Sequence, residues 1–135
     1  MKIFPAIDIK DKKCVRLIKG DFKQKTEYGT SPINQAEKYK DHGFKNLHIV
    51  DLDGALSGET VNLDLIEKIV SKFDLKIEIG GGVRTFESVK KYIDSGVDKV
   101  ILGSAAIKDK NFLKEACSKF PNKIALGLDA KDGYL

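Results

Sequence analysis

The sequence has few of the residues that mark disulfide-rich or zinc-binding proteins. It contains no tryptophan, one methionine, three prolines and two cysteines in 135 residues. Cys14 and Cys117 lie far apart, form no CxxC spacing and have no histidine pattern beside them. Neither a disulfide framework nor a metal site is therefore predicted, and both cysteines are expected to be small core residues.

Long hydrophobic runs are also missing. No stretch approaches the roughly 18 apolar residues of a membrane-spanning helix. The first five residues lead directly into a predicted strand and lack the three regions of a signal peptide. We therefore expect no membrane association and a cytoplasmic location.

Charge is abundant but not concentrated. The net charge is +4 with a pI near 8.9, and the positive residues are nearly all lysines scattered along the chain. No basic stripe is interleaved with aromatic residues, so no nucleic-acid binding is predicted. The only two arginines, Arg16 and Arg84, follow predicted strands. Because a guanidinium fork suits phosphate, their placement favours a phosphorylated small molecule.

One short segment occurs twice, near the beginning and near the end of the sequence. Residues 6–12 (AIDIKDK) and 127–133 (GLDAKDG) share the order small, aliphatic, Asp, aliphatic or small, Lys, Asp. Each follows a run that is typical of a buried strand. Alternation puts Asp8 and Asp129 on the same face as small residues, which leave room beside each carboxylate. A single aspartate at a strand end usually caps a turn, but a repeated pair points to catalysis.

The predicted elements alternate between strands and helices. Residues 13–17 are interpreted as a strand extension or a hairpin arm, and residues 18–30 as a polar loop. Ser31 and Thr85 are predicted helix N-caps, and Asn62 is predicted to open a helix. Strands are predicted over 3–7, 46–52, 76–79, 97–102 and 124–129, and helices over 32–43, 62–73, 86–95 and 110–120.

This order predicts an α/β fold with a parallel sheet. An open doubly wound sheet and a (β/α)8 barrel both fit, but the repeated Asp motif favours the barrel, where first and fifth strands face each other across the axis. A barrel needs at least about 200 residues. We therefore predict one partial TIM-barrel domain over residues 1–135: a half-barrel of four βα units plus a fifth parallel strand. Its two edges would be unpaired, with Asp8 and Asp129 on opposite edge strands, and its inner face would be apolar. Such a half is expected to associate with another chain or to be completed by a missing C-terminal half.

Two glycine-containing turns are candidate phosphate sites. Residues 80–85 (GGGVRT) lie between a strand and a helix, where bare N–H groups and a helix N-terminus can hold an anion. A tight turn alone would need only one glycine. Gly103 and Ser104 follow the next strand and form a similar but weaker cradle. Together the two loops are expected to hold one phosphate through Gly81, Gly82, Gly103 and Ser104.

Polar residues mark the second predicted parallel strand. His48 lies on an otherwise apolar strand and is either a satisfied interior residue or a site residue. Asp51, at the end of that strand, is the better ligand candidate. Three further acids, Asp11, Asp53 and Asp132, are expected to shape turns.

These segments resemble a known enzyme family over all 135 residues. Residues 4–10 (FPAIDIK), 14–21 (CVRLIKGD), 48–55 (HIVDLDGA), 79–84 (IGGGVR) and 102–104 (LGS) are similar to the histidine-biosynthesis isomerase family. The sibling cyclase of that pathway, which takes ammonia from a glutaminase partner, shares the two aspartates and the triple glycine. It ranks second because it lacks the VDLDGA string. A non-catalytic half-barrel that binds phosphate or associates with itself is the third alternative.

The resemblance implies a cofactor-free rearrangement of a phosphorylated ribotide, from an aminoaldose to an aminoketose. It implies Asp8 as proton acceptor and Asp129 as proton donor, with Asp129 expected to keep its proton through partial desolvation. Arg16, Arg84, His48 and Asp51 would support the substrate. Because the family's second phosphate site lies in the missing half, this chain alone is expected to be inactive or very weak.

Overall fold

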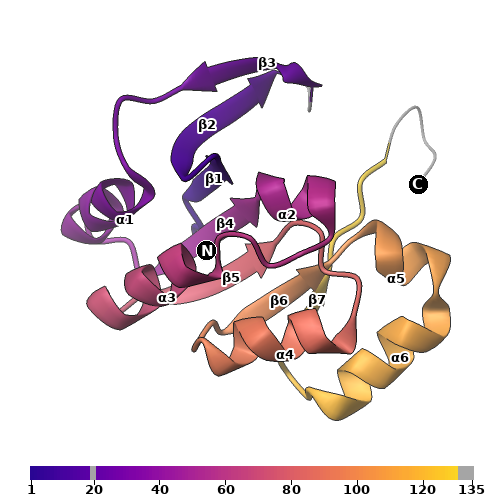
Figure 1. Cartoon of the computed structure of the whole chain (residues 1–135). Coiled ribbons are helices and arrows are strands. Elements are labelled where there is room, and N and C mark those ends of the chain that lie inside the picture. The colour runs from indigo at the N-terminus through magenta and orange to yellow at the C-terminus, as the bar shows by residue number, and fades with distance from the viewer. Residues whose placement is uncertain (19–20, 131–135) are drawn as a thin grey trace.

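The chain forms one open seven-stranded sheet (Figure 1). The structure is a computed structural model and describes residues 1–18 and 21–130. The strand order is β3-β2-β1-β4-β5-β6-β7, with β1 and β4 to β7 parallel and β2 antiparallel to both of its neighbours. The predicted α/β half-barrel with a fifth parallel strand is confirmed. The strands are β1 (Ala6–Lys10), β2 (Lys13–Ile18), β3 (Asp21–Glu27), β4 (Asn46–Asp51), β5 (Lys76–Gly80), β6 (Lys99–Leu102) and β7 (Ile124–Leu126).

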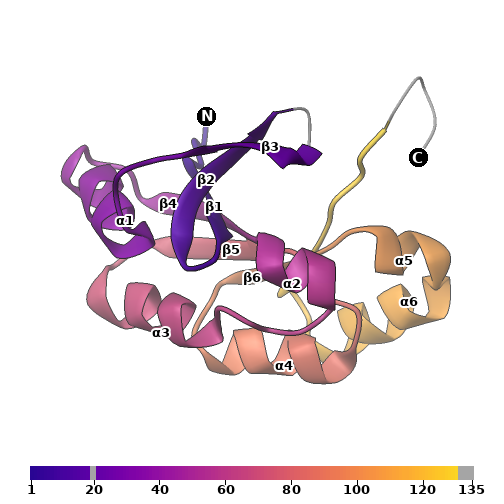
Figure 2. The ribbon, with the colours of Figure 1, turned by 45° about the horizontal axis from the view of Figure 1, so that its top comes forward.

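The longer helices lie on one side of this sheet and leave its other face open (Figures 1 and 2). Two short helices, α2 and α5, directly follow β4 and β6 and so lie at the carboxyl ends of these strands. The helices are α1 (Pro32–Asp41), α2 (Leu52–Ser57), α3 (Leu63–Lys72), α4 (Phe86–Asp94), α5 (Ser104–Lys108) and α6 (Lys110–Lys119).

Helix starts follow the local capping chemistry of the sequence. The Ser31 hydroxyl accepts a hydrogen bond from the Asn34 amide, and the Thr85 hydroxyl accepts one from the Ser88 amide. Each cap satisfies an amide that has no partner within its helix. Both predicted caps are confirmed, and α3 begins after Asn62 as predicted.

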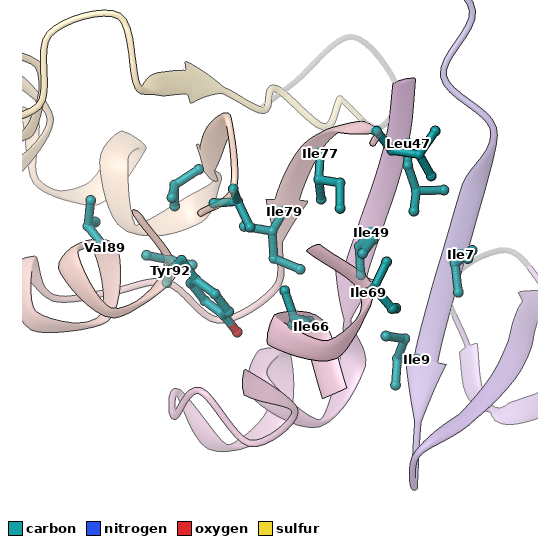
Figure 3. Packing of buried hydrophobic residues seen from close by; sticks show 14 of the residues in the cluster. Ile7, Ile9, Leu47, Ile49, Ile66, Ile69, Ile77, Ile79, Val89 and Tyr92 are labelled. Atoms are coloured by element: carbon teal, nitrogen blue, oxygen red, sulfur yellow. The ribbon is translucent and has the colours of Figure 1, made fainter. Parts of the chain in front are cut away.

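The hydrophobic core lies between the sheet and the helices (Figure 3). Alternate strand residues, such as Ile49 and Ile79, point to the helices and are completely buried. Ile66 and Ile69 of α3 meet them from the helix side. Burying one such side chain stabilises the fold by about 1.5–3 kcal/mol, so this single layer holds the sheet to its helices.

Several sequence predictions are wrong in detail. Residues 21–27 form β3 rather than part of a loop, because they pair with β2 although almost all of them are exposed. The hairpin arm is confirmed, and it covers β1, so the free edges are β3 and β7 and Asp8 is not on an edge strand. The open face is mixed rather than apolar, because His48 and Glu78 lie on it beside Val50 and Ile101.

The two cysteines differ in their surroundings. Cys14 is buried, as expected, and burial raises the pKa of its thiol to about 11. Cys117 lies on α6 with its side chain exposed, so its assignment to the core is wrong. The core stripe of α6 consists instead of residues such as Phe112 and Ala116.

Two isoleucines on opposite faces test which side of the sheet is the core. Ile79→Ala should lower the free energy of unfolding by about 3 kcal/mol, because it leaves a cavity among packed side chains. Ile101→Ala, on the open face, removes the same atoms and should cost less than about 1.5 kcal/mol. Urea unfolding measures both. Equal losses would contradict a core confined to the helix side.

Candidate active site

A cavity of about 730 Å³ lies at the carboxyl ends of the parallel strands. This is the edge of an α/β sheet where ligands usually bind. Nine of the ten predicted site residues line this one cavity, although they come from six separate segments of the sequence. They are Asp8, Arg16, His48, Gly81, Gly82, Arg84, Gly103, Ser104 and Asp129.

The two aspartates share this cavity even though the sheet is not closed. Asp8 lies in the middle of β1, and Asp129 follows β7. Burial raises the pKa of Asp8, and the nearby positive charges of Arg16 and His48 lower it in part. A carboxyl group with a raised pKa holds a proton more readily than an exposed aspartate, which suits proton exchange with a ligand.

Asp129 has a different environment. Its side chain is exposed, so the partial desolvation expected for Asp129 is not found, and Asp8 is the carboxyl group that burial affects. The strand that leads to Asp129 is also shorter than predicted, since β7 ends at Leu126. The rest of the second motif, from Lys131 onward, lies outside the described residues. In the open sheet, the carboxyl group of Asp8 is therefore half-buried, whereas that of Asp129 is exposed to solvent.

The two arginines are held differently. Arg16 is exposed on β2 and lines the cavity beside Asp8. Arg84 donates a hydrogen bond from Nη2 to the backbone oxygen of Ala55, at 2.9 Å. One arm of its guanidinium therefore holds the end of α2, while the side chain still borders the cavity.

The run of glycines in residues 80–82 has a structural explanation. Gly81 has a φ of +111° and Gly82 a φ of +72°. A Cβ at Gly81 would lie 2.1 Å from the backbone oxygen of Asp51, and one at Gly82 would lie 1.7 Å from the backbone oxygen of Gly54. Both glycines are needed because this loop packs directly against the backbone of the turn after β4. The glycines alone therefore no longer argue for phosphate, and the case for an anion rests on where they lie, beside Gly103, Ser104 and the two arginines.

Asp51 is the predicted site residue that does not line the cavity. It is completely buried, and its two carboxylate oxygens accept four hydrogen bonds. The donors are the amides of Gly54 and Asn62, Nδ2 of Asn62 and the hydroxyl of Tyr92. Asp51 therefore connects β4, α2, α3 and α4. It holds the segments around the cavity in place without lining the cavity itself. The backbone amide of Asp11 and Nδ2 of Asn62 both donate to Asp53, which holds the neighbouring turns together, as expected of a turn residue.

Sequence reasoning missed three polar residues around the site. Asn62 was predicted only to open a helix, and Tyr92 was simply part of the helix predicted over 86–95. Both are completely buried and donate to Asp51. Burial, followed by the charge of Asp51 and its hydrogen bond, raises the pKa of the Tyr92 hydroxyl, which therefore stays a donor. Glu78 was also missed. It lies inside the strand next to that of His48, so considering polar pairs across neighbouring strands could have identified it.

Within residues 1–18 and 21–130, no group of three or more His, Cys, Asp and Glu side chains could hold a metal ion. No helix in this described part of the chain is both long enough and apolar enough to cross a membrane.

The parallel sheet, its helices on one face and the cavity at the carboxyl ends of its strands define part of a barrel-type α/β fold. The profile of a family described as "Histidine biosynthesis protein" matches residues 2–135. The chain belongs to this family.

Relatives with curated names are similar over the whole chain. A protein of Pelagibacter ubique is 83% identical over 135 residues. Proteins of Listeria monocytogenes and Bacillus cereus are each 48% identical over the same length. All three are named 1-(5-phosphoribosyl)-5-((5-phosphoribosylamino)methylideneamino) imidazole-4-carboxamide isomerase, and the chain spans 56% of the length of each.

Removal of the Asp51 carboxylate should destabilise the fold severely. Asp51→Ala leaves four donors without their acceptor in a buried region, so the free energy of unfolding should fall by about 4 kcal/mol. Tyr92→Phe removes one of these bonds and should cost about 1 kcal/mol. Chemical denaturation compares the two variants. A loss below about 1 kcal/mol for Asp51→Ala would show that the cluster does not hold the loops.

The raised pKa of Asp8 predicts a specific dependence of stability on pH. Between the ordinary pKa of an aspartate, about 3.9, and the raised pKa of Asp8, the folded chain binds more protons than the unfolded chain. Stability contributed by protonated Asp8 is thus lost as pH rises through this window. Asp8→Asn should therefore be more stable than wild type at pH 7, and the difference should vanish below about pH 4.

Thermal unfolding at several pH values measures this difference. Asp94→Asn is the control, because Asp94 is exposed on α4 and pairs with Lys90. The assignment fails if Asp8→Asn is the less stable protein at pH 7.

Proposed function

We propose that this chain carries the catalytic carboxyl pair and one phosphate site of an isomerase in histidine biosynthesis. The substrate would be phosphoribosylformimino aminoimidazole carboxamide ribotide, an aminoaldose that is converted to the corresponding aminoketose without a cofactor. The observation that carries the proposal is the shared cavity, which Asp8 and Asp129 line together with the glycine loops and both arginines. The names of the similar proteins support the same reaction.

The reaction needs an acid and a base at different atoms of one sugar. Asp129 would donate a proton to the ring oxygen, which opens the ribose to a Schiff base. Asp8 would then remove the proton from C2′. The resulting enolamine would tautomerise to the ketone as C1′ takes up a proton and the 2′-hydroxyl loses one. The raised pKa of Asp8 supports its role, because a base whose pKa lies closer to the working pH binds the abstracted proton more strongly.

One phosphate of the substrate would lie at the rim. Gly81, Gly82, Gly103 and Ser104 line the cavity, where their backbone amides would bind the anion, and Arg16 and Arg84 would add positive charge. His48 would contact the sugar, whereas Asp51 would act only by holding the turn after β4 in place.

We propose further that residues 1–135 are a single partial TIM-barrel domain, which a second copy or a C-terminal half must complete. The exposure of Asp129 and the open face of the sheet support this proposal. The partner would be a phosphorylated ribotide rather than a nucleic acid or a membrane, and a biosynthetic role suggests the cytoplasm. Without completion, the substrate's second phosphate would have no site.

The experiment compares the chain alone with the chain joined to the remaining residues of the 83% identical relative. The chain alone should give no detectable turnover of the aminoaldose, and the joined protein should convert it to the aminoketose. Asp8→Asn or Asp129→Asn in the joined protein should lower kcat by at least about 100-fold, since each removes one proton-transfer group. Glu37→Gln, in an exposed pair with Lys72, is the matched control and should leave kcat unchanged.

Four outcomes would contradict the proposal. Turnover by the chain alone would show that completion is unnecessary. A folded but inactive joined protein would refute the isomerase assignment, and ammonia-dependent cyclase activity would favour the sibling enzyme. A joined protein that keeps full activity as Asp8→Asn would refute the role of the pair.

A further inference from the structure

A histidine and a glutamate form a close pair on the open face of the sheet. His48 on β4 and Glu78 on β5 are direct neighbours across the two parallel strands. Nδ1 of His48 lies 2.7 Å from Oε1 of Glu78. The side chains are 30% and 23% exposed, so the contact is partly shielded from water. Such a short bond in a half-buried position holds the orientation of the imidazole ring.

In the neutral imidazole, the pairing decides which nitrogen of His48 carries hydrogen. A carboxylate oxygen can only accept, so the hydrogen of the shared bond must lie on Nδ1. Nε2 is then the nitrogen left for other contacts, and among the described residues it has no hydrogen-bond partner. His48 lines the cavity, whereas Glu78 does not. Glu78 can therefore influence a molecule in the cavity only through His48.

The position of His48 relative to Asp8 gives this pair its significance. Ala6 on β1 is the strand neighbour of His48, and Asp8 lies two residues farther along on the same face. Both side chains border the same cavity. The positive charge of His48 is also one of the influences on the pKa of Asp8, after burial and Arg16.

No other described cation competes for Glu78. Lys99, its neighbour on β6, donates instead to the backbone oxygen of Asn122, at 3.1 Å. Lys76, two residues earlier on β5, is exposed at the other end of the strand. Glu78 therefore serves His48 alone among the residues that the structure describes.

We propose that Glu78 is a positioning residue for the candidate active site. By accepting from Nδ1 of His48, it fixes the ring so that Nε2 faces the cavity beside Asp8, ready to bind a hydroxyl of a sugar. This role in binding a sugar rests on the proposed function. The orientation and the protonated nitrogen of His48 are properties of the free chain and can be measured without substrate.

The ring nitrogens report the arrangement directly. Long-range ¹⁵N NMR of the chain at a pH where imidazoles are neutral distinguishes the two forms of the ring, and a neutral imidazole in water prefers hydrogen on Nε2. In wild type, His48 should carry its hydrogen on Nδ1. Glu78→Met, which has similar length but no oxygen, should move it to Nε2. Glu78→Gln, whose amide oxygen can still accept, should keep it on Nδ1.

The second histidine is an internal control. Nδ1 of His42 lies 2.7 Å from the backbone oxygen of Lys38, at the end of α1, so its signals should not change in either variant. The proposal is overturned if wild-type His48 carries hydrogen on Nε2, or if Glu78→Met leaves the form of His48 unchanged. The wild-type spectrum alone can overturn the proposal, whether or not a variant folds poorly.

A kinetic measurement separates this inference from the function itself. In the joined protein, Glu78→Met should lower kcat/KM by about 10-fold or more, and Glu78→Gln should restore most of the loss. An inactive joined protein refutes the isomerase, while the NMR result still decides the positioning role. An active joined protein in which Glu78→Met has wild-type kcat/KM would refute a role of Glu78 at the site.

Discussion

The buried carboxylate of Asp51 is the constraint on which the site depends. It has no cationic partner among the described residues, and four donors satisfy its oxygens instead. These donors fix the turn after β4, and the glycine loop after β5 lies against the backbone of that turn so closely that no side chain would fit. Because Arg84 also holds the end of α2, the rim of the cavity is a single connected unit. A buried and uncompensated charge is costly unless it is completely hydrogen-bonded, which explains why the surrounding sequence supplies so many donors.

The two faces of the open sheet differ in how completely their side chains are buried. On the helix side, the strand residues are completely buried and the core is continuous. On the other side, Asp8, His48 and Glu78 are only half-buried, and Asp129 is exposed. The candidate site residues therefore lie together, but the described part of the chain does not enclose them and water can reach them.

Local signals made much of the fold predictable. The helices capped by Ser31 and Thr85 were found because capping depends on side chains within one turn. The parallel sheet followed from the alternation of strands and helices. β3 was missed because it is a charged strand that only its partner β2 stabilises, and α2 and α5 were missed because they are too short to show a periodic pattern.

The sequence identified most of the residues at the site but not what each of them does there. Nine residues were found because glycine turns, and polar residues in or after apolar strands, are visible in the sequence, and the repeated aspartate indicated the pair. The burial of Asp51, the packing of Gly81 and Gly82, and the bond between Glu78 and His48 depend on residues that are distant in the chain. No local pattern contains such information, so these roles needed the structure.

The central claim is that the loops supported by Asp51 form an anion site next to Asp8. Titration of inorganic phosphate into the ¹⁵N-labelled chain tests it most directly, because each backbone amide reports its own contact with the anion. The account predicts that the amides of Gly82, Gly103 and Ser104 shift together along one saturable binding curve, and that this curve is lost in Gly82→Ala, whose Cβ would collide with Gly54. Shifts spread over the surface lysines, with no common curve at the two loops, would contradict the account.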